Sequence, residues 1–235
     1  MKMRIIKTVP SVIGCLLAFA VLPARADQLS FSLDLGNTSD PGISGFTGPY
    51  ATVTVDRTSS TTADITFTSL TKNGNIYLFG DGGSVALNVN GPFTVGDITG
   101  ANSGTGFTPG PLTQGAPGNE DGFGSFNFTA NSFDGYGHSS DNVIFTLTTS
   151  GTWASAADVL VANSLGVYSA AAHIFVAADP AVAGANGGFA LATGYAVNSS
   201  GGLPPQSIPD GGSTIALLGF AFLGIGALRK KISRN

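Results

Sequence analysis

Three carboxylates stand in glycine-rich stretches whose oxygen atoms suit a divalent cation. Glu120 and Asp121 are neighbours in the run Asn-Glu-Asp-Gly, and Asp81 precedes two glycines. Calcium prefers carboxylate and carbonyl oxygens held by loops, and Asp134, also before a glycine, offers one more. The spacing differs from that of an EF-hand loop, and Asp-Gly is also a common turn sequence. We expect no resident cofactor, and calcium bound by Asp81, Glu120 and Asp121 is the alternative.

A histidine, two serines and an aspartate follow one another from His138 to Asp141. These are the residue types of a hydrolase triad. Adjacent side chains of an extended chain point to opposite faces, so this spacing does not place Ser139 or Ser140 on the imidazole. The segment is therefore interpreted as a polar loop. The other histidine, His173, lies between apolar neighbours and is interpreted as a core or edge residue.

Sugar hydrolysis usually needs two carboxyl groups across a cleft, and the only glutamate, Glu120, has its carboxylate neighbour beside it in the chain. We expect no enzyme activity and assign no catalytic residue. Sugar binding stays open, because aromatic side chains beside glycines either stack on sugar rings or pin a loop to the core. The aromatic residues in such positions are Phe107, Phe123, Phe133, Tyr136 and Tyr195. Trp153 is interpreted as a core anchor.

The segments around these residues alternate apolar side chains with Ser or Thr, which predicts antiparallel β-strands with one buried face. Strands are expected at 29–35, 51–55, 63–70, 84–89, 125–129 and 143–148. Pairs such as Asn73-Gly74 mark tight turns between them. The fold class is therefore all-β, an antiparallel β-sandwich or jelly roll.

The secondary structure of three further segments is predicted separately. A short helix is expected at 155–164, and the alanine-rich run 170–178 is ambiguous between helix and strand but is interpreted as a strand. The stretch 102–119, dense in Gly, Pro, Ser and Thr, is expected to be a long surface loop.

The first 26 residues have the layout of a secretory signal peptide. Three cations precede an apolar run at 9–22, and small residues at Ala24 and Ala26 mark a site for signal peptidase. Cleavage after Ala26 would make Asp27 the first residue of the mature chain. It would also remove Cys15, the only cysteine, so the mature chain would have no thiol chemistry.

The charge of the middle region is strongly negative. Residues 27–207 contain 13 acidic residues against only Arg57 and Lys72, which gives a net charge of 2 − 13 = −11. Such a field repels phosphate backbones, so nucleic acid is excluded as a partner.

The C-terminal end carries a linker, a short motif and an apolar run with a basic stop. The motif residues are Pro209, Asp210, Gly211, Gly212 and Ser213, and the basic residues are Arg229, Lys230 and Lys231. A helix over 214–228 would measure about 22 Å, short of a hydrocarbon core of roughly 30 Å, although the flanking cations can snorkel to the interface. Because basic residues stay on the cytoplasmic side, the chain end would face inward and the middle outward.

This combination of a proline-acid motif, a short membrane segment and a terminal basic cluster resembles the PEP-CTERM class of sorting signals, in its VPDSG-type form. The resemblance implies recognition and cleavage near Pro209 and Asp210 by an exosortase, a membrane-embedded transpeptidase-like enzyme. Segments such as 76–83 and 150–158 are also similar to uncharacterised PEP-CTERM proteins, which have no established activity.

We therefore divide the chain into a signal peptide (1–26), a β-sandwich domain (27–200), a linker with sorting motif (201–213) and a transmembrane segment with basic tail (214–235). The expected role is an exported surface or extracellular-matrix protein, held transiently in the inner membrane through its C-terminal helix. The alternative is an extracellular module that binds polysaccharide, with or without calcium.

Overall fold

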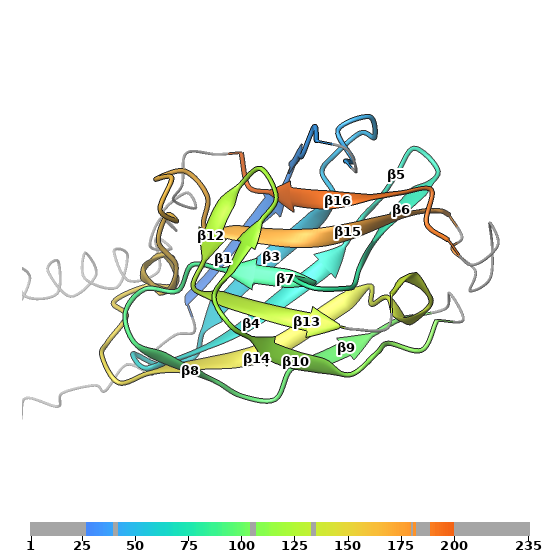
Figure 1. Cartoon of the computed structure of the whole chain (residues 1–235). Coiled ribbons are helices and arrows are strands. Elements are labelled where there is room, and N and C mark those ends of the chain that lie inside the picture. The colour runs from blue at the N-terminus through green and yellow to red at the C-terminus, as the bar shows by residue number, and fades with distance from the viewer. Residues whose placement is uncertain are drawn as a thin grey trace, which may run out of the picture.

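The computed structural model describes residues 27–39, 42–103, 107–132, 135–179, 181 and 189–199. Within them the chain is all-β, as predicted, and forms two antiparallel sheets packed face to face as a sandwich (Figure 1). The predictions for the signal peptide with Ala24 and Ala26, for the sorting motif, for the C-terminal helix with its basic stop, and for Phe133 and Asp134 lie outside the described residues.

The first sheet, sheet A, has the strand order β1-β3-β4-β14-β8. A sixth strand, β9, also pairs with β14 but lies outside this order. Its strands are β1 (Asp27–Leu33), β3 (Ala51–Arg57), β4 (Thr62–Ser69), β8 (Phe93–Val95), β9 (Thr99–Ala101) and β14 (Asn142–Thr149). Four of the predicted strands, at 29–35, 51–55, 63–70 and 143–148, supply β1, β3, β4 and β14. Most of their Ser and Thr residues face outward and most of their apolar residues face the second sheet, although on β14 Ile144 is exposed and Thr149 is buried.

The second sheet, sheet B, has the order β10-β13-β7-β15-β16-β2, with β6 pairing β15 and β5 pairing β6. Its strands are β2 (Leu35–Gly36), β5 (Thr71–Lys72), β6 (Asn75–Phe79), β7 (Val85–Leu87), β10 (Leu112–Gly115), β13 (Phe128–Ser132), β15 (Ala170–Ala178) and β16 (Ala192–Val197). The alanine-rich run 170–178 is thus a strand, as interpreted, and eight of its nine residues are buried because both of its faces are covered.

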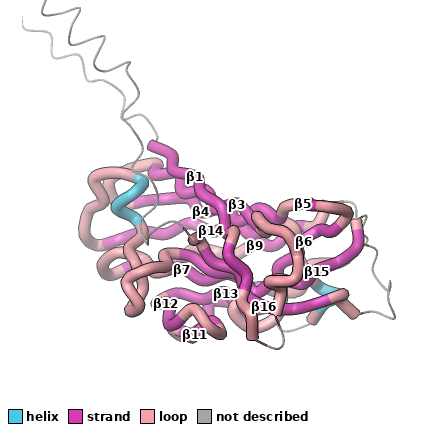
Figure 2. Tube along the Cα trace, turned by 90° about the horizontal axis from the view of Figure 1, so that it is seen from above, coloured by secondary structure: helices cyan, strands magenta, loops and turns pink. Residues whose placement is uncertain are grey.

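A small hairpin of β11 (Gly118–Glu120) and β12 (Gly124–Phe126) lies over the outer face of sheet B. Figure 2 shows sheet A on one side, sheet B next to it and this hairpin beyond sheet B. Phe123 and Phe126 pack against Ala171 and Val197, which point away from the main core. The hairpin is therefore a third partial layer, and it positions the residues considered below.

Among the described residues, the helices are two single 3-10 turns, η1 (Tyr136–His138) and η2 (Ala156–Val159). In the part of the chain that the structure describes, no helix combines the length and apolarity needed to cross a bilayer.

The core between the two sheets is filled by the inward-facing residue of each period-two pair. Phe128 and Phe145, from opposite sheets, approach with ring centroids 4.7 Å apart. Trp153 is 2% exposed and donates its Nε1–H to the carbonyl of Asn90 at 3.1 Å, so it is the core anchor that the sequence indicated. The predicted turn at Asn73 and Gly74 is present, with positive φ at both residues.

Three expectations need correction. The segment 155–164 forms only the single turn η2, because a capping interaction starts the turn and Leu160 is already extended. The stretch 102–119 is not one loop, since it contains β10 and the start of β11. The strand expected at 125–129 is two strands, β12 and β13, because the chain passes there from the outer hairpin into sheet B.

Candidate functional site

Segments far apart in the sequence meet on the outer face of sheet B, around Tyr195 on β16. Glu120 and Asp121 come from the β11–β12 hairpin, Asp81 from the turn before β7, and His173 from β15. Burial, followed by the charges of Glu120, Asp81 and Asp121, raises the pKa of Tyr195 to about 12. The His173 and Tyr195 rings lie 4.8 Å apart between centroids. We call these five residues the Tyr195 cluster.

Glu120 is the buried carboxylate of the cluster. Its side chain is 2% exposed, and its Oε2 has no hydrogen-bond partner among the described residues. Burial raises the pKa of Glu120 to about 8, so the carboxyl group is mainly neutral at pH 7. Gly83 lies against it with φ +66°, and a Cβ at that position would lie 2.5 Å from each carboxyl oxygen. Glycine therefore leaves the space that the Glu120 carboxyl group fills.

His173 is held by both of its ring nitrogens. Nδ1 lies 2.9 Å from the carbonyl oxygen of Gly80, which can only accept, so Nδ1 carries the proton. Nε2 then accepts the hydroxyl of Thr193 at 2.7 Å. Burial lowers the pKa of His173, although the Gly80 hydrogen bond and the Asp81 charge oppose that shift. The residue is a core histidine, with two bonded nitrogens, and has no nitrogen left for a ligand.

A hollow of about 390 Å³ opens beside Asp121. It is lined by Leu35, Gly36, Asn37, Thr38, Ser39, Asp121, Gly122 and Phe123. A chain of hydrogen bonds builds its wall: the Asn37 amide donates to Ser39 Oγ at 3.1 Å, and Ser39 Oγ donates to Asp121 Oδ2 at 2.9 Å. The amide oxygen of Asn37 accepts the backbone N–H of Tyr195 at 2.9 Å. The hollow thus lies between β2 and the hairpin, and hydroxyl and carboxylate groups line its wall.

The three carboxylates proposed as calcium ligands share a neighbour but do not converge. Among residues 27–199, as far as the structure describes them, no three Asp, Glu, His or Cys side chains come close enough to hold one metal ion. Nearby backbone oxygens are also engaged, because the Asp81 carbonyl accepts both Ser132 N and Ser84 Oγ. The described Asp81, Glu120 and Asp121 side chains therefore do not gather around one point as the ligands of a calcium ion do.

We therefore expect the melting temperature of the domain to be the same in excess calcium and in chelator. Calcium at a free concentration of 100 times its Kd would raise the free energy of unfolding by about 2.7 kcal/mol. The melting temperature of a domain of this size would then rise by several degrees. Differential scanning calorimetry checks this. A rise of that size, lost when Asp121 is changed to Asn, would restore the calcium alternative.

The segment from His138 to Asp141 does not form a triad. His138 Nδ1 donates to the carbonyl of Thr108 at 2.9 Å, and Ser139 Oγ donates to the backbone carbonyl three residues earlier at 2.7 Å. Asp141 Oδ2 accepts the backbone N–H and hydroxyl of Ser103, each at 2.7 Å. The His138, Ser139 and Asp141 side chains each bond to a group outside the set, so the three are not arranged as a triad.

The aromatic residues considered for sugar stacking are mostly buried. Phe107, Phe123 and Tyr136 are 6%, 5% and 8% exposed, and Tyr195 is half-buried. Phe107 and Tyr136 pack edge to face at 5.1 Å, and Phe123 packs in the same way on Tyr168 at 5.3 Å. For Phe107, Phe123 and Tyr136 the second interpretation holds, because they pin loops to the outer face of sheet B, whereas Tyr195 lies within β16.

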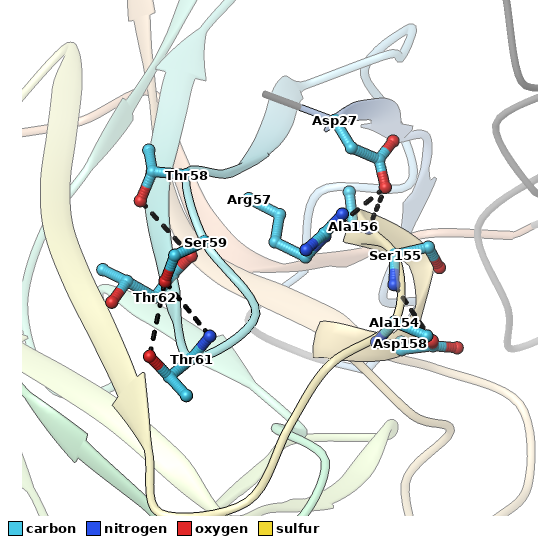
Figure 3. A network of polar contacts seen from close by, with 10 residues as sticks. All are labelled: Asp27, Arg57, Thr58, Ser59, Thr61, Thr62, Ala154, Ser155, Ala156 and Asp158. Carbon is cyan, nitrogen blue, oxygen red and sulfur yellow. Dashed lines mark hydrogen bonds and ion pairs between the residues drawn. The ribbon is translucent and has the colours of Figure 1, made fainter. Parts of the chain in front are cut away.

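A separate polar network surrounds the start of β1 (Figure 3). Asp27 pairs with Arg57 in the β1–β3 register, and its Oδ2 accepts the backbone N–H of Ala156 at 2.6 Å. The Arg57 Nε lies 3.6 Å from the same oxygen. Asp158 caps the same turn, because its Oδ2 accepts the backbone N–H of Ser155 at 3.1 Å. The first residue of β1 is thus tied to β3 and to η2.

Asn37 and Asn131 are site residues that sequence reasoning missed. Asn131 Oδ1 accepts the backbone N–H of Gly83 at 2.8 Å and so fixes the glycine that faces Glu120. Both asparagines lie next to Ser, Thr or Gly and look like ordinary turn or strand residues. No local signal distinguishes them, because their partners are 48 and 158 residues away.

A β-sandwich followed by a proline-acid motif, an apolar run and a basic end defines an exported protein with a C-terminal sorting signal. The particular signal is the VPDSG-CTERM motif, which matches residues 207–232. It is a PEP-CTERM-like signal, which implies processing by an exosortase, export and cell-surface localisation. No curated protein and no solved structure matches the chain.

Proposed function

We propose that this chain matures into a non-enzymatic structural component of the cell surface or extracellular matrix, after removal of residues 1–26 and processing at the sorting signal. The observation that carries the proposal is the VPDSG-CTERM match at 207–232. It indicates the destination, and the β-sandwich is the part that would be delivered.

The start of the folded domain supports the proposed maturation. β1 begins at Asp27, directly after the site expected for signal peptidase, and pairs with β3 from that residue onward. Cleavage after Ala26 would therefore leave β1 intact from Asp27 to Leu33.

The polar groups of His173 and Glu120 are enclosed within the protein, which supports a structural role. In the Tyr195 cluster both nitrogens of His173 are hydrogen-bonded and the Glu120 carboxyl group is covered by the hairpin. Catalysis would need an acid, base or nucleophile within reach of a substrate. The net charge of −11 between residues 27 and 207 supplies solubility outside the cell.

The C-terminal apolar segment supplies a transient anchor in this proposal. A helix over 214–228 would hold the chain in the inner membrane, with Arg229, Lys230 and Lys231 on the cytoplasmic side. This orientation would place Pro209 and Asp210 on the outer side, where an exosortase could cleave near them.

Replacing Pro209 and Asp210 by alanine is expected to abolish delivery to the surface. The full-length or signal-cleaved chain should accumulate in the membrane fraction, because the apolar anchor stays attached. Surface-shaved and membrane fractions are compared by immunoblot in cells with and without the exosortase.

Gly201→Ala with Gly202→Ala in the linker is the matched control, since it changes two residues outside the matched range 207–232. This control should be sorted normally. Equal surface delivery of the P209A/D210A variant, or of the unaltered chain in cells without exosortase, would refute the proposed route.

The hollow beside Asp121 favours a second candidate, the binding of an extracellular carbohydrate. Its wall presents the Asp121 carboxylate and the Ser39 hydroxyl, which suit sugar hydroxyl groups. A polysaccharide pull-down with the signal-cleaved chain tests this, and Asp121→Ala should release the bound polymer while Asp97→Ala should not. Retention that is equal for both variants, or none with the unaltered protein, would remove this candidate.

A further inference from the structure

We infer that the hollow beside Asp121 binds a polymer of amino sugars through one of their positively charged amino groups. The inference names a class of carbohydrate, and it rests on the second proposed candidate, the binding of an extracellular carbohydrate in this hollow. With a volume of about 390 Å³, the hollow is large enough for a small-molecule site, since such sites measure about 300–1,000 Å³.

The hydrogen bonds from Asn37 to Asp121 run in one direction. The Asn37 amide donates to Ser39 Oγ, and the Ser39 hydroxyl donates its only hydrogen to Asp121 Oδ2. Asp121 is exposed, and its other oxygen, Oδ1, takes part in no hydrogen bond with another described residue. The series therefore ends on an acceptor that faces solvent. A ligand must donate to it, and an ammonium group has three donors and no acceptor.

The electrostatic field at the hollow also favours a cation. Among the described residues that line it, none is a lysine, an arginine or a histidine. Residues 27–207 contain only Arg57 and Lys72 against 13 acidic residues. A cleft with charges of one sign concentrates ligands of the opposite sign. Uronic acids, which carry carboxylates, are therefore repelled, and amino sugars are favoured over neutral sugars.

The apolar part of the lining favours a sugar ring over the side chain of a lysine. Leu35, which is 40% exposed, and Phe123 supply apolar surface in the same hollow as the Asp121 carboxylate. Small-molecule sites combine such surface with a few placed polar groups, and a sugar ring matches both with its C–H face and its amino group. A lysine carries the same charge, but its flexible stem loses rotamer freedom when it is held.

The test titrates the full-length chain, in detergent, with four probes. These are hexamers of glucosamine, of N-acetylglucosamine and of a uronic acid, together with hexalysine. Isothermal titration calorimetry at a mildly acidic pH, where free amines are protonated, measures each Kd. The N-acetylated hexamer has the same backbone as the glucosamine hexamer but lacks its charge. We expect it to bind at least about tenfold more weakly, because a charge-assisted hydrogen bond is lost. The uronic acid hexamer should not bind.

Two substitutions separate the hollow from the general acidity of the protein. Asp121→Asn removes the charge but keeps the shape of the side chain. The Kd for the glucosamine hexamer should rise by about tenfold to a hundredfold, the effect of one charge-assisted hydrogen bond. Asp97→Asn is the matched control, because it removes the same charge from an exposed position between β8 and β9 of sheet A. This control should leave the Kd unchanged.

Equal losses of affinity in D121N and D97N would overturn the inference, because attraction to the acidic surface as a whole would explain both. Hexalysine that binds as tightly as the glucosamine hexamer would overturn it as well. If the N-acetylated or the uronic acid hexamer bound as tightly and D121N weakened that binding, the carbohydrate candidate would stand and the amino-sugar inference would fall. Binding of none of the three sugar hexamers would remove both.

Discussion

Replacing Glu120 by glutamine is expected to remove a large loss of stability that the unaltered domain undergoes as the pH rises from 4.5 to about 8. Burial raises the pKa of Glu120 from 4.5 to about 8, a difference of about 3.5 units. At about 1.4 kcal/mol for each unit, the unaltered domain should lose about 5 kcal/mol of unfolding free energy across that range. Domains of this kind have only about 5–15 kcal/mol in total, so the effect is large.

The direction follows from proton linkage. The unfolded chain releases the Glu120 proton near pH 4.5, whereas the folded chain keeps it until about pH 8. The stabilising effect of protonated Glu120 is therefore fully present below pH 4.5 and is lost as the pH rises to about 8. His173 acts in the opposite sense, because burial lowers its pKa and stability falls as the pH drops below 6.5.

Urea unfolding at several pH values, for the unaltered chain and for E120Q, measures the effect. The quantity to compare is the difference between the two curves, in which the His173 contribution cancels. Glutamine keeps the shape of the protonated acid but cannot ionise, so the difference should change with pH in favour of E120Q up to about pH 8. Two parallel curves would contradict the burial of a neutral carboxyl group at this position.

Gly83→Ala is expected to destabilise the domain by about 2 to 5 kcal/mol, the sum of a backbone cost and a packing cost. The backbone of Gly83 has φ +66°, where a side chain costs about 1–2 kcal/mol. The added methyl group would also meet both Glu120 oxygens at 2.5 Å, and overpacking of that kind costs typically 1–3 kcal/mol. The loss in denaturation midpoint, at an unchanged m-value, reports it.

Two other glycines separate the contributions. Gly82→Ala, next in the chain, has open space around the added methyl group and no positive φ, so it should be nearly neutral. Gly74→Ala has φ +76° and open space, so it should show only the backbone cost. If G83A lost no more unfolding free energy than G74A, that result would contradict the close contact between Gly83 and Glu120.

Both predictions concern the contact between Glu120 and Gly83, and each changes one of the two residues. Glu120 sits on a short hairpin, and Gly83 sits in a turn of sheet B, 37 residues earlier in the chain. Loss of the contact should therefore loosen the hairpin first. Hydrogen exchange of the β11–β12 amides, measured in E120Q and G83A, would show whether the hairpin opens as a local unit.

The amino-acid sequence by itself determined the main strands of sheet A and the presence of a C-terminal sorting signal. Alternating Ser or Thr and apolar residues predicted β1, β3, β4 and β14, because a period of two needs only neighbouring residues to be read. Asn73 and Gly74 predicted a turn for the same reason. The sorting signal is likewise contiguous, so Pro209 and Asp210 could be recognised without any fold.

Which residues from those segments become neighbours was decided only by the tertiary structure. The fold brings Glu120 and Asp81 close enough to Tyr195 for their charges to raise its pKa, although the three come from separate elements, and packing of the hairpin over sheet B buries Glu120 and keeps it mainly neutral. The loop aromatics Phe107 and Phe123 are covered for the same reason. Burial and pKa depend on contacts between residues distant in the chain, and period-two patterns carry no information about which strands become neighbours.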